Sequence, residues 1–156
     1  MDFEVRRARV DDAEAISAVR IATWRTAYAH LLSAEFLAAM PETSAMWRSV
    51  IERDRPIWVA ETEGRVFGIA AAREAQGEDA VRARELALLY VLEEFHGTGA
   101  GQALIDAALG DEPAQLWVAE DNPRAIAFYR RNGFAPDGTR KIDDEFEGLA
   151  EIRLVR

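Results

Sequence analysis

The strongest constraint on the fold is a glycine-rich stretch, Glu94 to Gln102, between an apolar run and a helical pattern. The run from Leu86 to Leu92 is apolar throughout, which is typical of a strand buried on both faces. Three alternate glycines follow it and predict a sharp turn into a helix from Gln102 to Leu109. Backbone N–H groups at such a helix start, with the positive end of the helix dipole, suit an anion such as a pyrophosphate. A tight turn that binds nothing is the alternative.

Two nucleotide-binding fingerprints are excluded at this loop. A P-loop requires Gly-Lys-Ser/Thr four residues after its first glycine, but Gln102 and Ala103 follow Gly97 at that distance. The dinucleotide fingerprint requires glycine at its sixth position. Counting from Gly97 that position is Gln102, and counting from Gly99 it is Leu104. A nucleotide-binding protein is therefore a remote alternative.

Hydrophobic periodicity and turn residues predict the other elements. Asp11, with Glu14 in capping-box spacing, is expected to begin a first helix whose apolar positions continue to Leu31. Further helices are predicted at Ser33 to Met40, Thr43 to Asp54, Gln102 to Leu109 and Asn122 to Asn132. Strands are predicted at Phe3 to Arg9, Ile57 to Glu61, Arg65 to Ala72, Arg84 to Val91, Ala114 to Glu120, Phe134 to Arg140 and Ala150 to Val155. This order predicts one α/β (α+β) domain over residues 1–156, with a mixed sheet and helices on its faces.

Composition narrows the class of function. The 156 residues include no cysteine, which excludes disulfides, thiolate metal sites and an acyl-cysteine intermediate. The net charge of −9, without a Lys/Arg cluster, argues against nucleic acid as a partner. The acidity is compatible with a cationic acceptor, although solubility is the simpler explanation of it. No signal peptide or membrane-spanning run is visible, so a soluble cytoplasmic protein without membrane contact is expected. The two histidines have no metal-ligand spacing, and no metal is predicted.

Two motifs together resemble the GNAT superfamily of acyl-CoA-dependent N-acetyltransferases. The family's acetyl-CoA motif, Gln/Arg-x-x-Gly-x-Gly/Ala, is filled by His96, Gly99 and Gly101. Its second signature, Asn-x-x-Ala-x-x-Phe-Tyr followed by Gly-Phe, is matched from Asn122 to Tyr129 and by Gly133-Phe134. The sequence departs from the family at His96, at Thr98, where a basic residue is common, and at Glu93, where proline is common. The element order matches along nearly the whole chain.

This resemblance implies a GNAT-like domain with a mostly antiparallel sheet of about seven strands, splayed between the fourth and fifth. It implies transfer of an acetyl group from acetyl-CoA to a primary amine by direct attack in a ternary complex. The acceptor would be a small molecule or a peptide or protein amine, and a homodimer is possible. The residues that would contact the coenzyme are Leu89, Tyr90, Val91, Gly97, Thr98, Gly99, Ala100, Gly101, Gln102 and Asn122.

Five side chains would serve binding or the chemistry, and each has a simpler explanation. Tyr129 would protonate the leaving thiolate, or it is a core aromatic beside Phe128. Glu85 would be the general base, or a solvated glutamate at a strand end. Trp24 and Tyr28 would border the acceptor, or pack in the core. Asn122 is explained equally well as a helix cap. A non-catalytic acyl-CoA-binding or sensing module on the same fold remains the alternative function.

Overall fold

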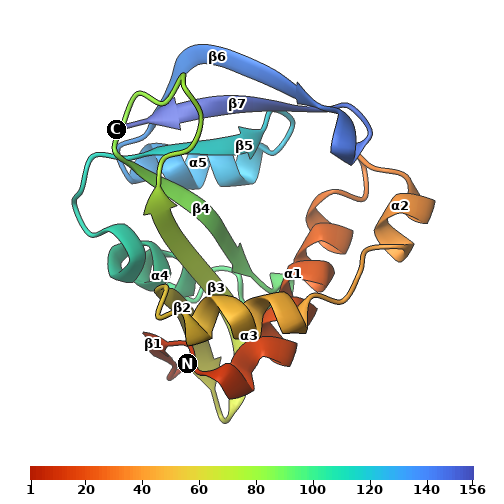
Figure 1. Cartoon of the computed structure of the whole chain (residues 1–156), viewed down its shortest axis with the longest axis vertical. Helices are drawn as coiled ribbons and strands as arrows, with labels where there is room; N and C mark the ends of the chain where they lie inside the picture. The colour runs from red at the N-terminus through yellow and green to blue at the C-terminus, as the bar shows by residue number, and fades with distance from the viewer.

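The computed structural model describes residues 1–156 and contains one seven-stranded sheet (Figure 1). In chain order the strands are β1 (Glu4–Arg7), β2 (Ile57–Thr62), β3 (Arg65–Glu74), β4 (Arg84–Val91), β5 (Gln115–Ala119), β6 (Ala135–Asp143) and β7 (Leu149–Val155). Their order across the sheet is β1-β2-β3-β4-β5-β7-β6. Every neighbouring pair is antiparallel except β4 and β5. The predicted mixed, mostly antiparallel sheet is confirmed.

Helices cover both faces of this sheet (Figure 1). They are α1 (Ala13–Ala27), α2 (Ala34–Ala38), α3 (Ser44–Glu52), α4 (Ala100–Leu109) and α5 (Pro123–Arg131), with 3-10 turns η1 (Val10–Asp12), η2 (Glu93–Phe95) and η3 (Asp144–Phe146). On one face, Ile16 and Val19 of α1 pack with Val59 and Ile69. On the other, α4 and α5 pack against β4, β5 and β7 in a separate apolar cluster. None of these helices is long and apolar enough to cross a membrane.

The sheet opens between β4 and β5, as the resemblance implied. These two strands pair at a single position, Glu85 with Gln115, and then diverge. Because of this divergence, the prediction that β4 is buried on both faces is wrong. Leu86 is buried, but Ala87 is exposed and Leu88 to Val91 are only half-buried. An apolar strand edge therefore faces a cleft rather than a neighbouring strand.

Two local predictions at the first helix are also wrong. Asp11 does not cap α1. The neighbouring Asp12 holds the turn instead, because its carboxylate accepts the Arg9 backbone N–H at 2.7 Å and pairs with Arg6 at 2.8 Å. The helix ends at Ala27, so Leu31 packs from the following loop rather than from the helix. The other predicted elements are present, with ends that move by a few residues.

Candidate active site

A cleft of about 1100 Å³ lies where β4 and β5 separate. Its walls come from β4, the loop before α4, the first turns of α5, the end of α1 and the β6–β7 connection. Apart from Thr98, every site residue predicted from the sequence lines it: Trp24, Tyr28, Glu85, Leu89, Tyr90, Val91, Gly97, Gly99, Ala100, Gly101, Gln102, Asn122 and Tyr129. The structure thus brings together residues that the sequence spreads from position 24 to position 129.

The glycine loop forms one end of this cleft. Gly99 stands just before α4 with φ of +89°, in the left-handed region that glycine favours, and a Cβ there would meet open space. The first backbone hydrogen bond of α4 runs from Ala103 N–H to the Gly99 carbonyl, at 3.1 Å. The N–H groups of Gly101 and Gln102 therefore have no backbone partner, as expected at a helix start. The arrangement is that of an anion site at a helix N-terminus.

Side chains of α5 add positive charge near the loop. Thr98 is turned inward, with its hydroxyl donating to the Phe95 carbonyl at 2.8 Å, so it does not line the cleft. Arg124 and Arg131 do line it. The Arg131 guanidinium lies 5.8 Å from the centre of the Phe128 ring, and that ring is also the nearest neighbour of Gly101. Arg131 therefore lies on the side of the cleft where the N–H group of Gly101 is free.

Asn122 and Tyr129 place α5 against the cleft. The Asn122 side chain accepts the Ala125 N–H at 3.3 Å, so its predicted role as a helix cap is confirmed. Tyr129 is buried, with its ring 5.5 Å from that of Phe128 and 6.0 Å from that of Phe134. Its hydroxyl has no hydrogen-bond partner in the protein and is not sealed from the cleft. Burial raises the pKa of Tyr129, and so do the neighbouring Tyr28 and Tyr90, so the phenol stays protonated at neutral pH.

Trp24 and Tyr28 form an aromatic wall on the opposite side. Their rings lie 4.6 Å apart, and the Trp24 indole N–H donates to the Tyr90 hydroxyl at 3.0 Å. The Phe146 ring packs 4.9 Å from Trp24. Trp24 is a buried core residue, whereas Tyr28 is only half-buried. Core packing of Trp24 and lining of the cleft by both rings therefore occur together, and contact of this wall with the acceptor stays a prediction.

Glu85 occupies the point where β4 and β5 part. It is 3% exposed, and its Oε2 accepts two hydrogen bonds from Arg73, from Nε at 3.0 Å and from Nη2 at 2.8 Å. Its Oε1 accepts from the buried Gln115 side chain at 3.0 Å. The alternative of a solvated strand-end glutamate is therefore wrong, because cross-strand pairing buries the carboxylate against Arg73.

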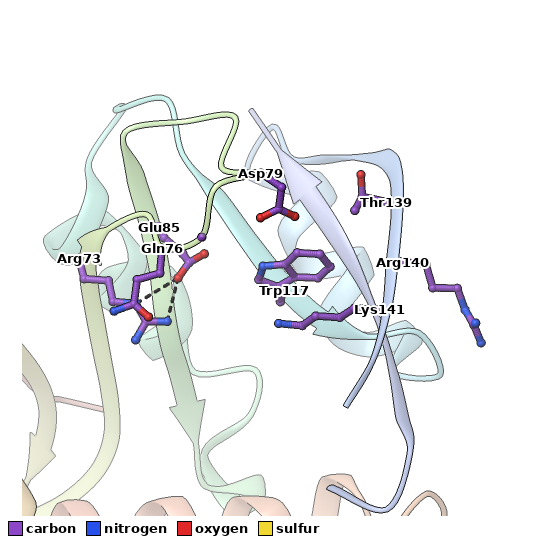
Figure 2. Close-up of a pocket in the computed structure, with 9 residues that line it drawn as sticks. Arg73, Gln76, Asp79, Glu85, Trp117, Thr139, Arg140 and Lys141 are labelled. Carbon is purple, nitrogen blue, oxygen red and sulfur yellow. Dashed lines mark hydrogen bonds and ion pairs between the residues drawn. The ribbon is translucent and has the colours of Figure 1, made fainter. Parts of the chain in front are cut away.

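A polar pocket of about 360 Å³ continues the cleft beyond Glu85 (Figure 2). It shares Arg73, Glu85, Trp117 and Lys141 with the larger cleft. Figure 2 shows the Arg73–Glu85 pair on one side and Trp117 with Lys141 on the other. The Lys141 ammonium lies 4.2 Å from the centre of the Trp117 ring. The sequence reasoning did not single out Arg73, Trp117, Lys141, Asp143, Phe146 or Glu151, because no motif marks their positions.

Comparisons with known proteins agree with this geometry. The family described as acetyltransferase (GNAT) domain matches residues 53–136. The uncharacterized N-acetyltransferase YuaI of Bacillus subtilis (strain 168) is 32% identical over 96% of this chain and 87% of its own. The peptidyl-lysine N-acetyltransferase YjaB of Salmonella typhimurium is 27% identical over 99% of both chains. The solution structure of apo YjaB from Escherichia coli superposes with a TM-score of 0.70, at 25% identity over 99% of this chain and 97% of that one. The chain therefore belongs to the GNAT family of acetyltransferases, as its two motifs predicted.

Proposed function

We propose that the protein transfers an acetyl group from acetyl-CoA to a primary amine by direct attack in a ternary complex. The observation that carries the proposal is the open β4 edge, with the α4 anion site at one end and the buried, protonated Tyr129 beside it. Such a cleft fits a long ligand with an anionic end and a reactive group in a drier interior. Acetyl-CoA, when bound, supplies the thioester that is attacked.

The residues of the cleft fit this co-substrate. The free N–H groups of Gly101 and Gln102, with Arg124 and Arg131, would hold the pyrophosphate. On the side of the splay, the backbone of Leu89 to Val91 has no strand partner, and only the Val91 carbonyl is contacted there, by His96 Nε2 at 3.0 Å. This edge would bind the pantetheine arm as a sheet edge binds an added strand. A β4 N–H group would also polarise the acetyl carbonyl. Asn122, at the start of α5, is predicted to contact the coenzyme as well.

Two protons have to move during transfer. Tyr129 would deliver one to the leaving thiolate, since its raised pKa keeps the phenol protonated at working pH. A base must remove the other from an acceptor ammonium, whose ordinary pKa is ~10.4. The family resemblance implies Glu85 as this base, and Glu85 lines the cleft, where it pairs with Arg73. Its three hydrogen bonds mean that it would have to act through a reorganised pair or a water.

The acceptor class we propose is a primary alkylamine, with the lysine side chain included. YjaB of Salmonella typhimurium is a peptidyl-lysine N-acetyltransferase by name, and the net charge of −9 favours a cationic acceptor. The aromatic wall of Trp24, Tyr28 and Phe146 suits the apolar stem of such a side chain.

A thiol-release assay tests the proposal directly. The protein is given acetyl-CoA and a panel of polyamines, amino acids, lysine peptides and peptides with a free N-terminus. We expect free CoA to appear only when an amine is present, together with an acetylated product by mass spectrometry. Tight acetyl-CoA binding by calorimetry, without turnover on any amine, would instead support a non-catalytic acyl-CoA-binding module on the same fold.

A further inference from the structure

The acceptor side of the cleft contains a second carboxylate, Glu151 on β7. It pairs with Ala119 in the β5–β7 ladder and lines the cleft beside Tyr28 and Tyr90. Its side chain is 19% exposed, so it is shielded from solvent but reachable from the cleft. The Glu151 carboxylate forms one ion pair, with the Lys141 ammonium at 4.0 Å, and no N–H or O–H group of the protein donates a hydrogen bond to this carboxylate. Most of its lone pairs are therefore free for a ligand.

The charged and titratable groups around Glu151 come from three elements. Burial raises the pKa of Glu151; Lys141 on β6 opposes this and Asp143 on β6 adds to it. In return, the Glu151 charge adds to the rise that burial causes in the pKa values of Tyr28, directly after α1, and of Tyr90 on β4. Glu151 therefore lies near both hydroxyls, and those two tyrosines in turn act on Tyr129. The Glu151 carboxylate therefore lies in the same part of the cleft as Tyr129, the predicted acid.

The surroundings of Glu151 already accommodate an alkylammonium group. The Lys141 ammonium lies 4.0 Å from the Glu151 carboxylate and 4.2 Å from the centre of the Trp117 ring. An aromatic face and a carboxylate are the two groups that attract an alkylammonium most strongly in proteins. Tyr28 and Phe146 also line the cleft, and both rings pack against Trp24.

We propose that Glu151 binds the ammonium group of the acceptor and takes its proton. This inference rests on the proposed acetyl transfer and names the residue that recognises the acceptor. It assigns the acceptor class as amines that are cationic at neutral pH. Free lone pairs on the carboxylate decide this assignment. Glu85 differs from Glu151 in this respect, because three N–H groups of Arg73 and Gln115 already donate to its carboxylate.

The step balances without any further reactant. One proton passes from the ammonium nitrogen to a Glu151 oxygen, which leaves a neutral amine with a free lone pair. That nitrogen attacks the thioester carbon, so a C–N bond forms and the C–S bond breaks. The thiolate receives its proton from Tyr129, and the second amine proton and the Glu151 proton return to solvent and to the phenolate.

The test compares Glu151→Gln with the parent across pH, using an alkylamine that the parent acetylates. We expect the rate at pH 7 to fall roughly 10²-fold, as for loss of a positioned base, and the deficit to shrink to within a few-fold near pH 10. A weakly basic aromatic amine, which is neutral at pH 7, should lose far less. A parental rate and an unaltered pH profile in a folded Glu151→Gln protein would overturn the inference.

Two further variants keep the result interpretable. Glu74→Gln, at an exposed position at the end of β3, is the matched control and should leave rate and profile unchanged. Glu151→Asp keeps the charge but withdraws it by one methylene, so we expect at least a several-fold loss at pH 7. If Glu151→Gln does not fold, a parental rate in Glu151→Asp overturns the inference. A parent that acetylates no amine at all refutes the proposed function instead, so the two failures are distinct.

Discussion

Replacing Gly99 with valine should separate coenzyme binding from fold stability. The residue has φ of +89°, and a left-handed conformation costs a residue with a side chain about 1–2 kcal/mol. The added Cβ meets no protein atom within 4 Å, so the valine side chain adds bulk in open space at the loop where the anion is proposed to bind. Displacing one hydrogen bond to a charged phosphate costs about 1.5–3 kcal/mol, which corresponds to about a 10- to 150-fold loss of affinity.

Gly64 provides a matched control for this substitution. It lies in the β2–β3 turn with φ of +79°, and a Cβ there also meets nothing within 4 Å. Gly64→Val should therefore show the same strain, a fall in melting temperature of roughly 2–8 °C, without any loss of coenzyme affinity. Calorimetry with CoA and thermal melting of both variants give the comparison. Parental CoA affinity in a folded Gly99→Val protein would refute the assignment of the loop.

Three other substitutions test the site and its support. Tyr129→Phe should lower turnover by about 10²-fold with a nearly unchanged melting curve, whereas a change of only a few-fold would mean that Tyr129 is a core aromatic. Glu85→Gln is measured by unfolding and by its pH–rate profile. If Glu85 is the base, the variant should lose rate near pH 7 and recover it near pH 10. A loss of stability with an unchanged pH–rate profile would exclude that role. Asp12→Asn should destabilise the protein by about 1–3 kcal/mol at pH 7, as seen in urea unfolding. Burial raises the pKa of Asp12, but the Arg6 hydrogen bond and the Arg9 N–H outweigh it and lower the pKa overall. The Asp12 contribution is therefore complete above its unfolded pKa and lost as pH falls through the lower folded value, and a difference from the parent that persists below that value would contradict this account.

Turn and cap residues mark where helices and strands begin and end, and they explain why the sequence predicted most elements correctly. Asn122-Pro123 at the start of α5 and Gly133 after its end fix both limits of that helix, because proline suits the first turn and glycine the left-handed exit. Glu63-Gly64 does the same for the β2–β3 hairpin, with both residues at positive φ. These signals are local, so they survive without knowledge of the tertiary structure.

Apolar residues that face a substrate cleft resemble core residues in the sequence, and this caused the main error. Leu88 to Val91 were expected to be buried on both faces, yet they are half-buried along the open side of β4. A strand that will bind a ligand and a strand that will bind a neighbour carry the same apolar side chains. Only the divergence of β5, a property of the whole sheet, separates the two cases.

The ion-pair partner of Glu85 could not be predicted from the sequence either, because it too depends on how the strands pair. The sequence places Arg84 next to Glu85, but the ion pair is with Arg73, which lies directly opposite on β3. That pairing depends on a bulge between Ala71 and Ala72, which shifts the register by one residue. Glu151 carries no motif either, and its importance follows only from the strands and aromatic rings assembled around it.

The two carboxylates of the cleft meet opposite physical requirements. At the single β4–β5 pairing, the Glu85 carboxylate is linked to β3 through Arg73 and to β5 through Gln115, whose side-chain oxygen in turn accepts the Val81 N–H at 2.9 Å. These three hydrogen bonds stabilise the geometry around the buried carboxylate, and they leave it few free lone pairs. A base needs the reverse, free lone pairs and a pKa moved toward neutrality by burial, and Glu151 has both. Glu85 therefore links β3, β4 and β5 where β4 and β5 begin to part, whereas Glu151 keeps the free lone pairs that the proposed base requires.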